Sequence, residues 1–197
     1  MPIITVNAWL KIPSNFNQLS SLSYLPASDL SDWSDLSDLS DSSKTAATSP
    51  RRAMFPGSFD PFTRGHQSLV DRGLQLFDVV VIAVGISTKK PVTEEEIVQR
   101  LAPIRALYAN EPRVEVIHYT GLTVDAARRA GCNFLLRGIR NAIDMEYERS
   151  LADVNRRISG IETILLFTLP ELSAISSSVV RELSHYGHNV DDFMPSI

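Results

Sequence analysis

The chain has 197 residues, of which 44% are hydrophobic and 21% are charged, and its formal net charge at pH 7 is −4. This composition is typical of one globular domain with a sizeable core, and the acidic balance argues against a large nucleic-acid-binding surface. No apolar run is long enough to span a membrane, and the single cysteine, Cys132, excludes an internal disulfide and suits a reducing compartment.

Residues 1–50 differ in kind from the rest of the chain. Residues 28–43 have the sequence SDLSDWSDLSDLSDSS, and this period of three matches neither a helix nor a strand. The acidic, low-complexity composition predicts a disordered Ser/Asp-rich tail over residues 1–50, followed by one folded domain over residues 51–197. The start of the chain lacks the basic region and cleavage site of a signal peptide. The tail is either a regulatory, partner-binding arm or a dispensable extension.

From residue 52 onward, strand patterns alternate with amphipathic helix patterns. Strands are predicted where apolar, β-branched residues run together, and helices where apolar residues recur every three or four positions. The run DVVVIAVGIS is apolar almost throughout, as expected for a strand buried on both faces of a parallel sheet. In chain order, strands are predicted at 52–55, 78–87, 114–119, 133–139 and 162–169, and helices at 65–77, 93–110, 123–131, 142–160 and 176–187.

This alternation predicts right-handed βαβ units and an α/β fold. The expected architecture is Rossmann-like: a doubly wound, parallel five-stranded sheet with helices on both faces. In the helix at 93–110, Thr93 and Glu96 form a capping box, whereas Pro103 is expected to kink or split the helix. The helix at 142–160 carries an apolar side. Ligands of such folds bind beyond the carboxyl ends of the strands, so the strand-to-helix junctions should carry the chemistry.

The stretch FPGSFDPFTRGH, residues 55–66, contains too many breakers for a core strand and ends in a histidine. Gly57 would let the backbone approach a phosphate closely, and Ser58 can donate a hydroxyl hydrogen bond. His66, near the start of the next predicted helix, can donate to phosphate oxygens. The stretch is therefore predicted to be a phosphate-binding turn.

Further anion-binding features fall at the other junctions. Lys89–Lys90 follows one predicted strand, and Arg137 and Arg140 follow another. Gly138, next to Arg137, indicates close approach of a ligand to the backbone. The serines at 176–178 open a helix, where free N–H groups and the dipole attract anions. Together these features predict a ligand with several phosphates.

Several common motifs are missing from the sequence. There is no G-x-x-x-x-G-K-[ST] P-loop and no G-x-G-x-x-G dinucleotide fingerprint, and no Ser or Cys lies in a nucleophile elbow. His185 and His188, with Asp191 nearby, are interpreted as incidental near the chain end, so we expect no protein-bound metal.

The tetrapeptide TRGH, residues 63–66, resembles the (H/T)-x-G-H signature of the nucleotidyltransferase superfamily. The motifs PGSFDPFTRGH, STKKP, LLRGIRNAIDMEYE and ISSS follow in order, so residues 52–193 resemble bacterial phosphopantetheine adenylyltransferases. The chain departs from the common pattern at Phe55, Ser58 and Leu172, where relatives often have Tyr, Thr and an aromatic residue.

The resemblance implies that the folded domain is a nucleotidyltransferase. Such enzymes reversibly transfer AMP from Mg-ATP to 4'-phosphopantetheine, giving dephospho-coenzyme A and pyrophosphate, by in-line attack without a covalent intermediate. The resemblance implies ATP as co-substrate, Mg²⁺ carried by ATP, no nucleic-acid or membrane partner, a cytoplasmic location and a homohexamer.

The resemblance also implies roles for individual residues. His66, Lys89 and Arg137 would be catalytic, and Ser58, Lys89, Thr123 and Arg137 would bind 4'-phosphopantetheine. The residues expected to bind ATP are Ser58, Phe59, His66, Gly138, Ile139, Arg140, Glu148, Leu172, Ser173, Ala174, Ile175, Ser176, Ser177 and Ser178.

Two alternatives remain open at this point. A sister enzyme of the same fold would transfer a nucleotide to glycerol phosphate, to nicotinamide mononucleotide or to a flavin. A non-catalytic nucleotide-binding protein would use the acidic tail as its interaction arm.

Overall fold

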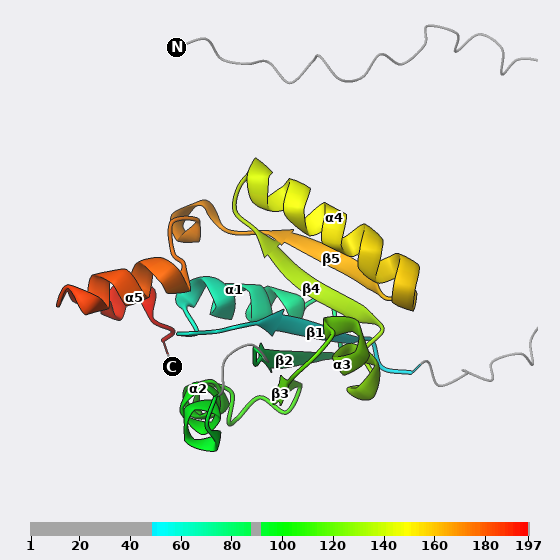
Figure 1. Ribbon diagram of the computed structural model, residues 1–197, viewed down its shortest axis with the longest axis horizontal. Helices are drawn as coiled ribbons and strands as arrows, with labels where there is room; N and C mark the ends of the chain where they lie inside the picture. Colours follow the sequence, from blue (N-terminus) through cyan, green and yellow to red (C-terminus); the bar gives the residue numbers. More distant parts are fainter. Residues whose placement is uncertain (1–48, 88–91, 197) are drawn as a thin grey trace, which may run out of the picture. The chain divides into compact units, whose positions relative to one another are not determined.

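The computed structural model describes residues 49–87 and 92–196. Its strands form one parallel sheet in the order β3-β2-β1-β4-β5 (Figure 1). The predicted Rossmann-like sheet is confirmed, and the strand order changes direction between β1 and β4. The predicted tail, apart from its last two residues, and Lys89–Lys90 lie outside the described residues. The strands are β1 Arg52–Gly57, β2 Val79–Gly85, β3 Val114–Tyr119, β4 Phe134–Ile139 and β5 Glu162–Phe167.

Helices cover both faces of the sheet. The helices α1 and α2 pack on one face, whereas α3 packs on the other face with α4 beside it. The described segments contain α1 Arg64–Gly73, α2 Glu94–Leu107, α3 Thr123–Arg129, α4 Ala142–Ser159, α5 Ser177–His185 and the short 3-10 helices η3 Pro170–Leu172 and η4 Asp191–Phe193.

The central strands are buried on both faces, as their apolar sequences predict. In β1, Phe55 packs toward α1 and α2, and the adjacent Met54 packs toward α3. In β2, Ile82 packs on the same face as α1 and α2, and Val81 packs on the face of α3. Every residue from 80 to 84 is fully buried. This burial anchors the carboxyl ends of the strands from which the functional loops emerge.

The helix α2 confirms the predicted capping box but not the predicted break. The Glu96 N–H donates to Thr93 Oγ1 at 3.3 Å, and the Thr93 N–H donates to Glu96 Oε2 at 2.9 Å. The helix runs on through Pro103 to its end at Leu107, so of the two expected effects, a kink or a split, the proline does not cause the split. Leu101 and Ile104 on either side of the proline are buried, and this packing holds the last turn in place.

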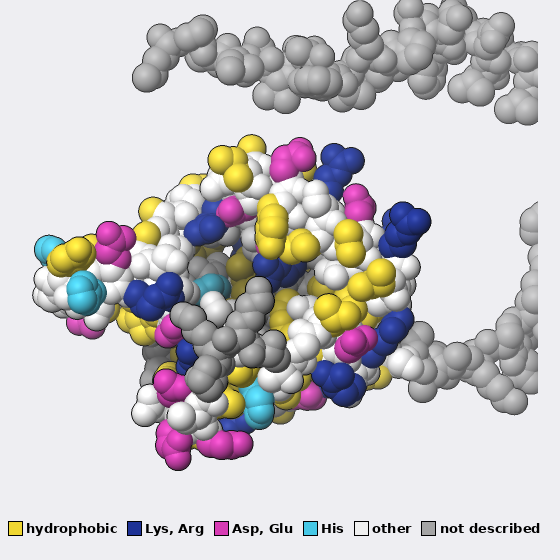
Figure 2. Space-filling view, in the orientation of Figure 1, with side chains coloured by type: hydrophobic (Ala, Val, Ile, Leu, Met, Phe, Trp, Pro, Cys, Tyr) yellow, Lys and Arg dark blue, Asp and Glu magenta, His cyan; other side chains and the backbone are white. Residues whose placement is uncertain are grey.

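The apolar side predicted for α4 faces outward. Ile143 is 82% exposed, and Tyr147, Val154 and Ile158 are each more than half exposed. Figure 2 shows apolar side chains gathered over α4. The helix is therefore held to the sheet by its other side, and this apolar surface is left without a covering element in the described part of the chain.

Gly138 in β4 makes room for α1. A Cβ at this position would overlap Leu69 Cδ1 and lie 3.3 Å from Leu69 Cδ2, and Leu69 is itself buried. We therefore expect Gly138→Ala to lower the free energy of unfolding by about 1–3 kcal/mol, measured by denaturant titration. Because the clash is with one side chain, the cost in a Leu69→Ala background should be smaller. An unchanged unfolding free energy in Gly138→Ala would contradict this packing argument.

Candidate active site

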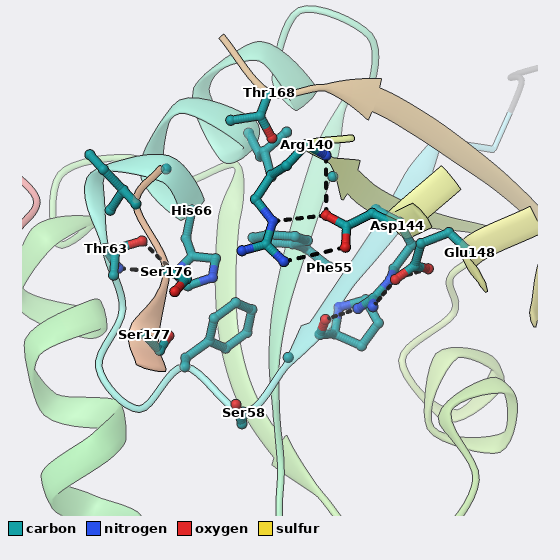
Figure 3. A pocket seen from close by; sticks show the side chains of 18 of the residues that line it. Phe55, Ser58, Thr63, His66, Arg140, Asp144, Glu148, Thr168, Ser176 and Ser177 are labelled. Carbon is teal, nitrogen blue, oxygen red and sulfur yellow. Dashed lines mark hydrogen bonds and ion pairs between the residues drawn. The ribbon is translucent and has the colours of Figure 1, made fainter. Parts of the chain in front are cut away.

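A cavity of about 410 Å³ lies at the carboxyl ends of β1 and β4, beside the change in strand order. Its walls come from the loop after β1, the start of α1, the end of β4, one side of α4 and the segment that enters α5 (Figure 3). Figure 2 shows a hollow on this face with a histidine in its wall. The strand-to-helix junctions therefore meet at one site, as the sequence predicts.

The loop after β1 is built on an aromatic cluster. Phe59 has a positive φ of 45°, and its ring centroid lies 5.1 Å from those of Phe55 and His66 and 5.3 Å from that of Phe62. A Cβ on Gly57 would come within 2.7 Å of this ring. Gly57 therefore makes room for the Phe59 ring. This packing requirement is a second reason for the glycine, in addition to the expected close approach of a phosphate. The cluster fixes the histidine ring from one side.

Two hydrogen bonds fix the orientation of His66. The Thr63 N–H donates to His66 Nδ1 at 3.0 Å, and the Thr63 hydroxyl lies 3.0 Å from the same nitrogen. Nδ1 is thus an acceptor, so in the neutral ring Nε2 carries the hydrogen. Burial, together with the positive charges of Arg140 and Arg137, lowers the pKa of His66 to about 4. His66 is therefore a neutral hydrogen-bond donor around neutral pH.

The lowered pKa of His66 predicts a pH dependence of stability. The ordinary pKa is 6.5 and the folded-state pKa is about 4, so between these values the unfolded chain binds a proton that the folded chain does not. This contribution to stability is complete above pH 6.5 and is lost as the pH falls toward 4. We expect His66→Gln to flatten this part of the profile, measured as unfolding midpoints from pH 7 to pH 4. An equal loss in both proteins would contradict the assignment.

Arg137 is held at three of its nitrogen atoms. Nε donates to Glu148 Oε2 at 2.8 Å, Nη2 donates to Glu148 Oε1 at 2.5 Å, and Nη1 donates to the carbonyl oxygen of Pro56 at 2.6 Å. Burial lowers the pKa of Arg137, but the hydrogen bonds and charge of Glu148 outweigh it and raise the pKa overall. The cavity therefore contains a permanent, fixed cation from β4.

Arg140 is held in a looser way. Its Nε donates to Asp144 Oδ2 at 2.8 Å and its Nη2 donates to Asp144 Oδ1 at 3.4 Å. The arginine hydrogen bonds keep the pKa of Asp144 below its usual range. The Asn141 side chain caps α4 by accepting from the Asp144 N–H at 2.9 Å. The Arg140 side chain is 41% exposed, so a ligand can reach it more easily than Arg137.

The serines at the start of α5 use their hydroxyl groups mainly within the protein. Ser176 caps the helix by accepting from the Val179 N–H, and Ser177 Oγ donates to the carbonyl oxygen of Pro61 at 2.8 Å. Arg181 in α5 also donates to the carbonyl oxygen of Asp60. The other first-turn backbone N–H groups of α5 have no intrahelical acceptor, and such groups favour anions. The same contacts tie α5 to the loop that carries the aromatic cluster.

Most of the residues predicted for the site meet in this cavity. Thr123 does not line it, because it lies at the start of α3 with its hydroxyl 2.9 Å from that of Tyr119. Lys89 lies outside the described residues. The predicted residues that line the cavity are Ser58, Phe59, His66, Arg137, Gly138, Arg140, Glu148, Ile175, Ser176, Ser177 and Ser178, whereas Ile139, Leu172, Ser173 and Ala174 do not.

Sequence reasoning did not assign Thr63 and Asp144 to the site. Thr63 belongs to the TRGH motif and stands one helical turn before His66, so its contact with His66 could have been predicted from the sequence. Asp144 stands four residues before Glu148, which places both carboxylates on one side of a helix. The pairing of Glu148 with Arg137 could be found only from the contact between α4 and β4, whereas Arg140 stands just four residues before its partner Asp144.

This site brings a neutral histidine, two arginines and a helix N-terminus around one cavity of an α/β sheet. It has the features of a phosphate-binding site such as a nucleotidyltransferase requires. A family model described as "Cytidylyltransferase-like" matches residues 54–183, which agrees with this class.

Comparison with curated proteins identifies the family within the nucleotidyltransferase class. The phosphopantetheine adenylyltransferase of Bacteroides fragilis is 51% identical over 145 residues, which are 74% of this chain and 96% of that protein. The phosphopantetheine adenylyltransferase of Porphyromonas gingivalis is 52% identical over 143 residues, which are 73% of this chain and 93% of that protein. The chain therefore belongs to the phosphopantetheine adenylyltransferase family, and the resemblance inferred from its motifs is confirmed.

Among solved structures, a bifunctional NMN adenylyltransferase/ADP ribose pyrophosphatase from Francisella tularensis is similar in fold. It matches with a TM-score of 0.56 at 16% identity, over 75% of this chain and 46% of that chain. At this identity the similarity concerns the fold alone.

Within the described residues, none of the helices is both long and apolar enough to cross a membrane.

Proposed function

We propose that this chain transfers the adenylyl group of ATP to 4'-phosphopantetheine, giving dephospho-coenzyme A and pyrophosphate in a reversible reaction. The observation that carries the proposal is the meeting of His66, Arg137 and Arg140 with the start of α5 in one cavity, in a chain about half identical to curated phosphopantetheine adenylyltransferases. The N–H groups of these side chains and of the helix start suit phosphate-bearing substrates.

In the proposed reaction, a phosphate oxygen of 4'-phosphopantetheine attacks the α-phosphorus of ATP. The new O–P bond forms as the bond to the β-phosphate oxygen breaks, and pyrophosphate leaves with the electron pair. The attacking phosphate is already anionic, so no protein base is required. The barrier lies in bringing two anions together in line, and the protein lowers it by positioning and by neutralising charge.

Each side chain has a proposed task in this reaction. The Nε2–H of His66 donates to the ATP phosphates and stabilises the charge that develops on them. Arg137 and Lys89 hold the phosphate of the acceptor, and Arg140 meets the nucleotide phosphates. The remaining proposed contacts are Ser58 to both substrates, Phe59, Gly138 and Ile139 along the nucleotide, the 172–178 segment around ATP, and Thr123 along the pantetheine arm.

We propose that Mg²⁺ enters as part of the substrate, bound to ATP. In residues 49–87 and 92–196, no three His, Cys, Asp or Glu side chains are grouped so as to hold a metal ion. Mg²⁺ usually keeps several waters and binds through substrate phosphates, and the two carboxylates of the cavity, Asp144 and Glu148, are each paired with an arginine.

The absence of a covalent intermediate can be tested with ATP labelled at the α-phosphate. With 4'-phosphopantetheine present, the label should appear in dephospho-coenzyme A. Without the acceptor, the protein should carry no label after denaturation. Labelled protein that then passes its label to the acceptor would contradict in-line transfer.

The proposal includes a cytoplasmic enzyme that assembles as a homohexamer. The exposed apolar side chains of α4, among them Ile143, Tyr147, Val154 and Ile158, support burial of this surface against other copies of the chain. Light scattering coupled to gel filtration tests the assembly, because a monomer at micromolar concentration would contradict it.

A further inference from the structure

The helix α5 is anchored to the domain by little packing. Figure 1 shows it beyond the carboxyl ends of the strands, outside the helices that cover the sheet. Within Ser177–His185, Val180 is the one buried residue. The start of α5 nevertheless lines the active-site cavity and presents N–H groups that favour anions. Polar contacts therefore matter for where this helix start lies.

Two side chains of α5 reach the loop after β1. Ser177 Oγ donates to the carbonyl oxygen of Pro61 at 2.8 Å, and Arg181 donates to the carbonyl oxygen of Asp60. Arg181 Nη1 also lies 3.8 Å from the Asp60 carboxylate, and Nη2 donates to Ser178 Oγ at 3.3 Å. Residues 177 and 181 are four positions apart and share one side of the helix. Two consecutive carbonyl groups of the loop thus accept hydrogen bonds from the same side of α5.

These two carbonyl groups lie between the aromatic residues that hold His66. Phe59 stands directly before Asp60, and Phe62 stands directly after Pro61. Both phenylalanine rings are buried and pack against the His66 ring. The loop is therefore a fixed support for the histidine, and the contacts from α5 set where the helix start lies relative to the histidine.

The contact between α5 and this loop is bordered by open space. Arg181 and Pro61 line a groove of about 570 Å³, and Asp60 and Pro61 line a second cavity of about 330 Å³ beside α2. The side chains of Arg181 and Asp60 are 49% and 47% exposed, so their ion pair adds little to overall stability. Loss of Arg181 should thus move the helix start without unfolding the domain.

We propose that Arg181 is a positioning residue that holds the start of α5 beside His66, so that both donate to the phosphates of ATP together. Arg181 is outside the cavity lining that the described residues form, so it acts through the helix. This inference rests on the proposed function, because it takes ATP as the ligand of the cavity.

The test compares Arg181→Gln and Arg181→Lys with the wild type. The measurements are the Kd for Mg-ATP by calorimetry without acceptor, the kcat and the KM for 4'-phosphopantetheine. We expect Arg181→Gln to weaken the Mg-ATP Kd about fivefold or more, the effect of one lost hydrogen bond, and to lower kcat. The acceptor KM should stay within about twofold. Arg181→Lys should recover most of the ATP affinity, because its ammonium group also donates to the carbonyl oxygen of Asp60.

The matched control is Arg113→Gln. Arg113 is bound in a similar way, since it donates to the carbonyl oxygen of Leu74 at 3.2 Å and pairs with Glu111 at 2.8 Å. It precedes β3, however, at the amino ends of the strands. We expect its loss to leave the Mg-ATP Kd unchanged. A Kd within about twofold of the wild type in Arg181→Gln, or equal weakening in Arg113→Gln, would overturn the proposal.

Hydrogen exchange tests the position of α5 without any turnover. Backbone amides of α5 should exchange faster in Arg181→Gln than in the wild type and at nearly the wild-type rate in Arg181→Lys. Unchanged exchange in Arg181→Gln would contradict a positioning role. If the wild type binds Mg-ATP but makes no dephospho-coenzyme A, the proposed function fails, whereas the titrations and the exchange still decide the role of Arg181. A wild type that does not bind Mg-ATP overturns the inference.

Discussion

Replacing His66 with alanine is expected to lower kcat about 10²- to 10³-fold while changing the acceptor KM far less. The Thr63 N–H fixes Nδ1 as an acceptor, so Nε2–H is a donor held ready for charge that develops on the phosphates. Loss of one such preorganised donor has a cost of this size. The measurement is steady-state pyrophosphate release at saturating Mg-ATP.

His66→Gln provides the control for this prediction. Its side-chain amide can present an N–H near the position of Nε2, so it should recover part of the rate that His66→Ala loses. Circular dichroism spectra of both variants are compared with the wild type, because the His66 ring packs against Phe59 and Phe62 of the main core cluster. A His66→Ala enzyme within a few-fold of wild-type kcat would remove His66 from the mechanism.

Arg137→Gln is expected to lower both activity and stability. The variant loses the fixed cation that meets the acceptor phosphate, which should lower kcat/KM about 10²-fold or more. It also leaves the buried Glu148 carboxylate without its partner, which should lower the free energy of unfolding by about 3 kcal/mol. Pyrophosphate release and denaturant titration measure the two effects separately.

Removing the carboxylate as well separates these effects. In the Arg137→Gln/Glu148→Gln variant, no uncompensated charge is buried, so most of the lost stability should return. The activity should stay low because the cation is still missing. Stability that stays low in the double variant would show that the ion pair is not the source of the loss.

Much of the fold could be predicted because its central signals are local. The apolar run of β2 predicted a strand buried on both faces, and the capping box at Thr93 predicted the start of α2. Both predictions were correct because each feature depends on a few adjacent residues. The effect of Pro103 was predicted less well. Whether a proline breaks a helix depends on packing by Leu101 and Ile104, which the helical segment alone does not reveal.

The sequence predicted where in the fold the site lies, but only part of the contacts within it. The carboxyl ends of parallel strands meet at one edge of the sheet, so His66, Arg137 and the serines at the start of α5 could be expected together. The glycines were harder, because Gly57 makes room for the Phe59 ring and Gly138 makes room for Leu69. The partners of Glu148 and Ser177 lie 11 and 116 positions away in the sequence, so only the folded chain identifies them.

The central claim is tested most directly by pyrophosphate release from the full chain with Mg-ATP and three separate acceptors: 4'-phosphopantetheine, glycerol 3-phosphate and nicotinamide mononucleotide. We predict turnover with 4'-phosphopantetheine alone. Preferred turnover with either of the other acceptors would make the chain a sister enzyme of the same fold. Folded protein that binds ATP but turns over none of the three would contradict the enzyme assignment itself.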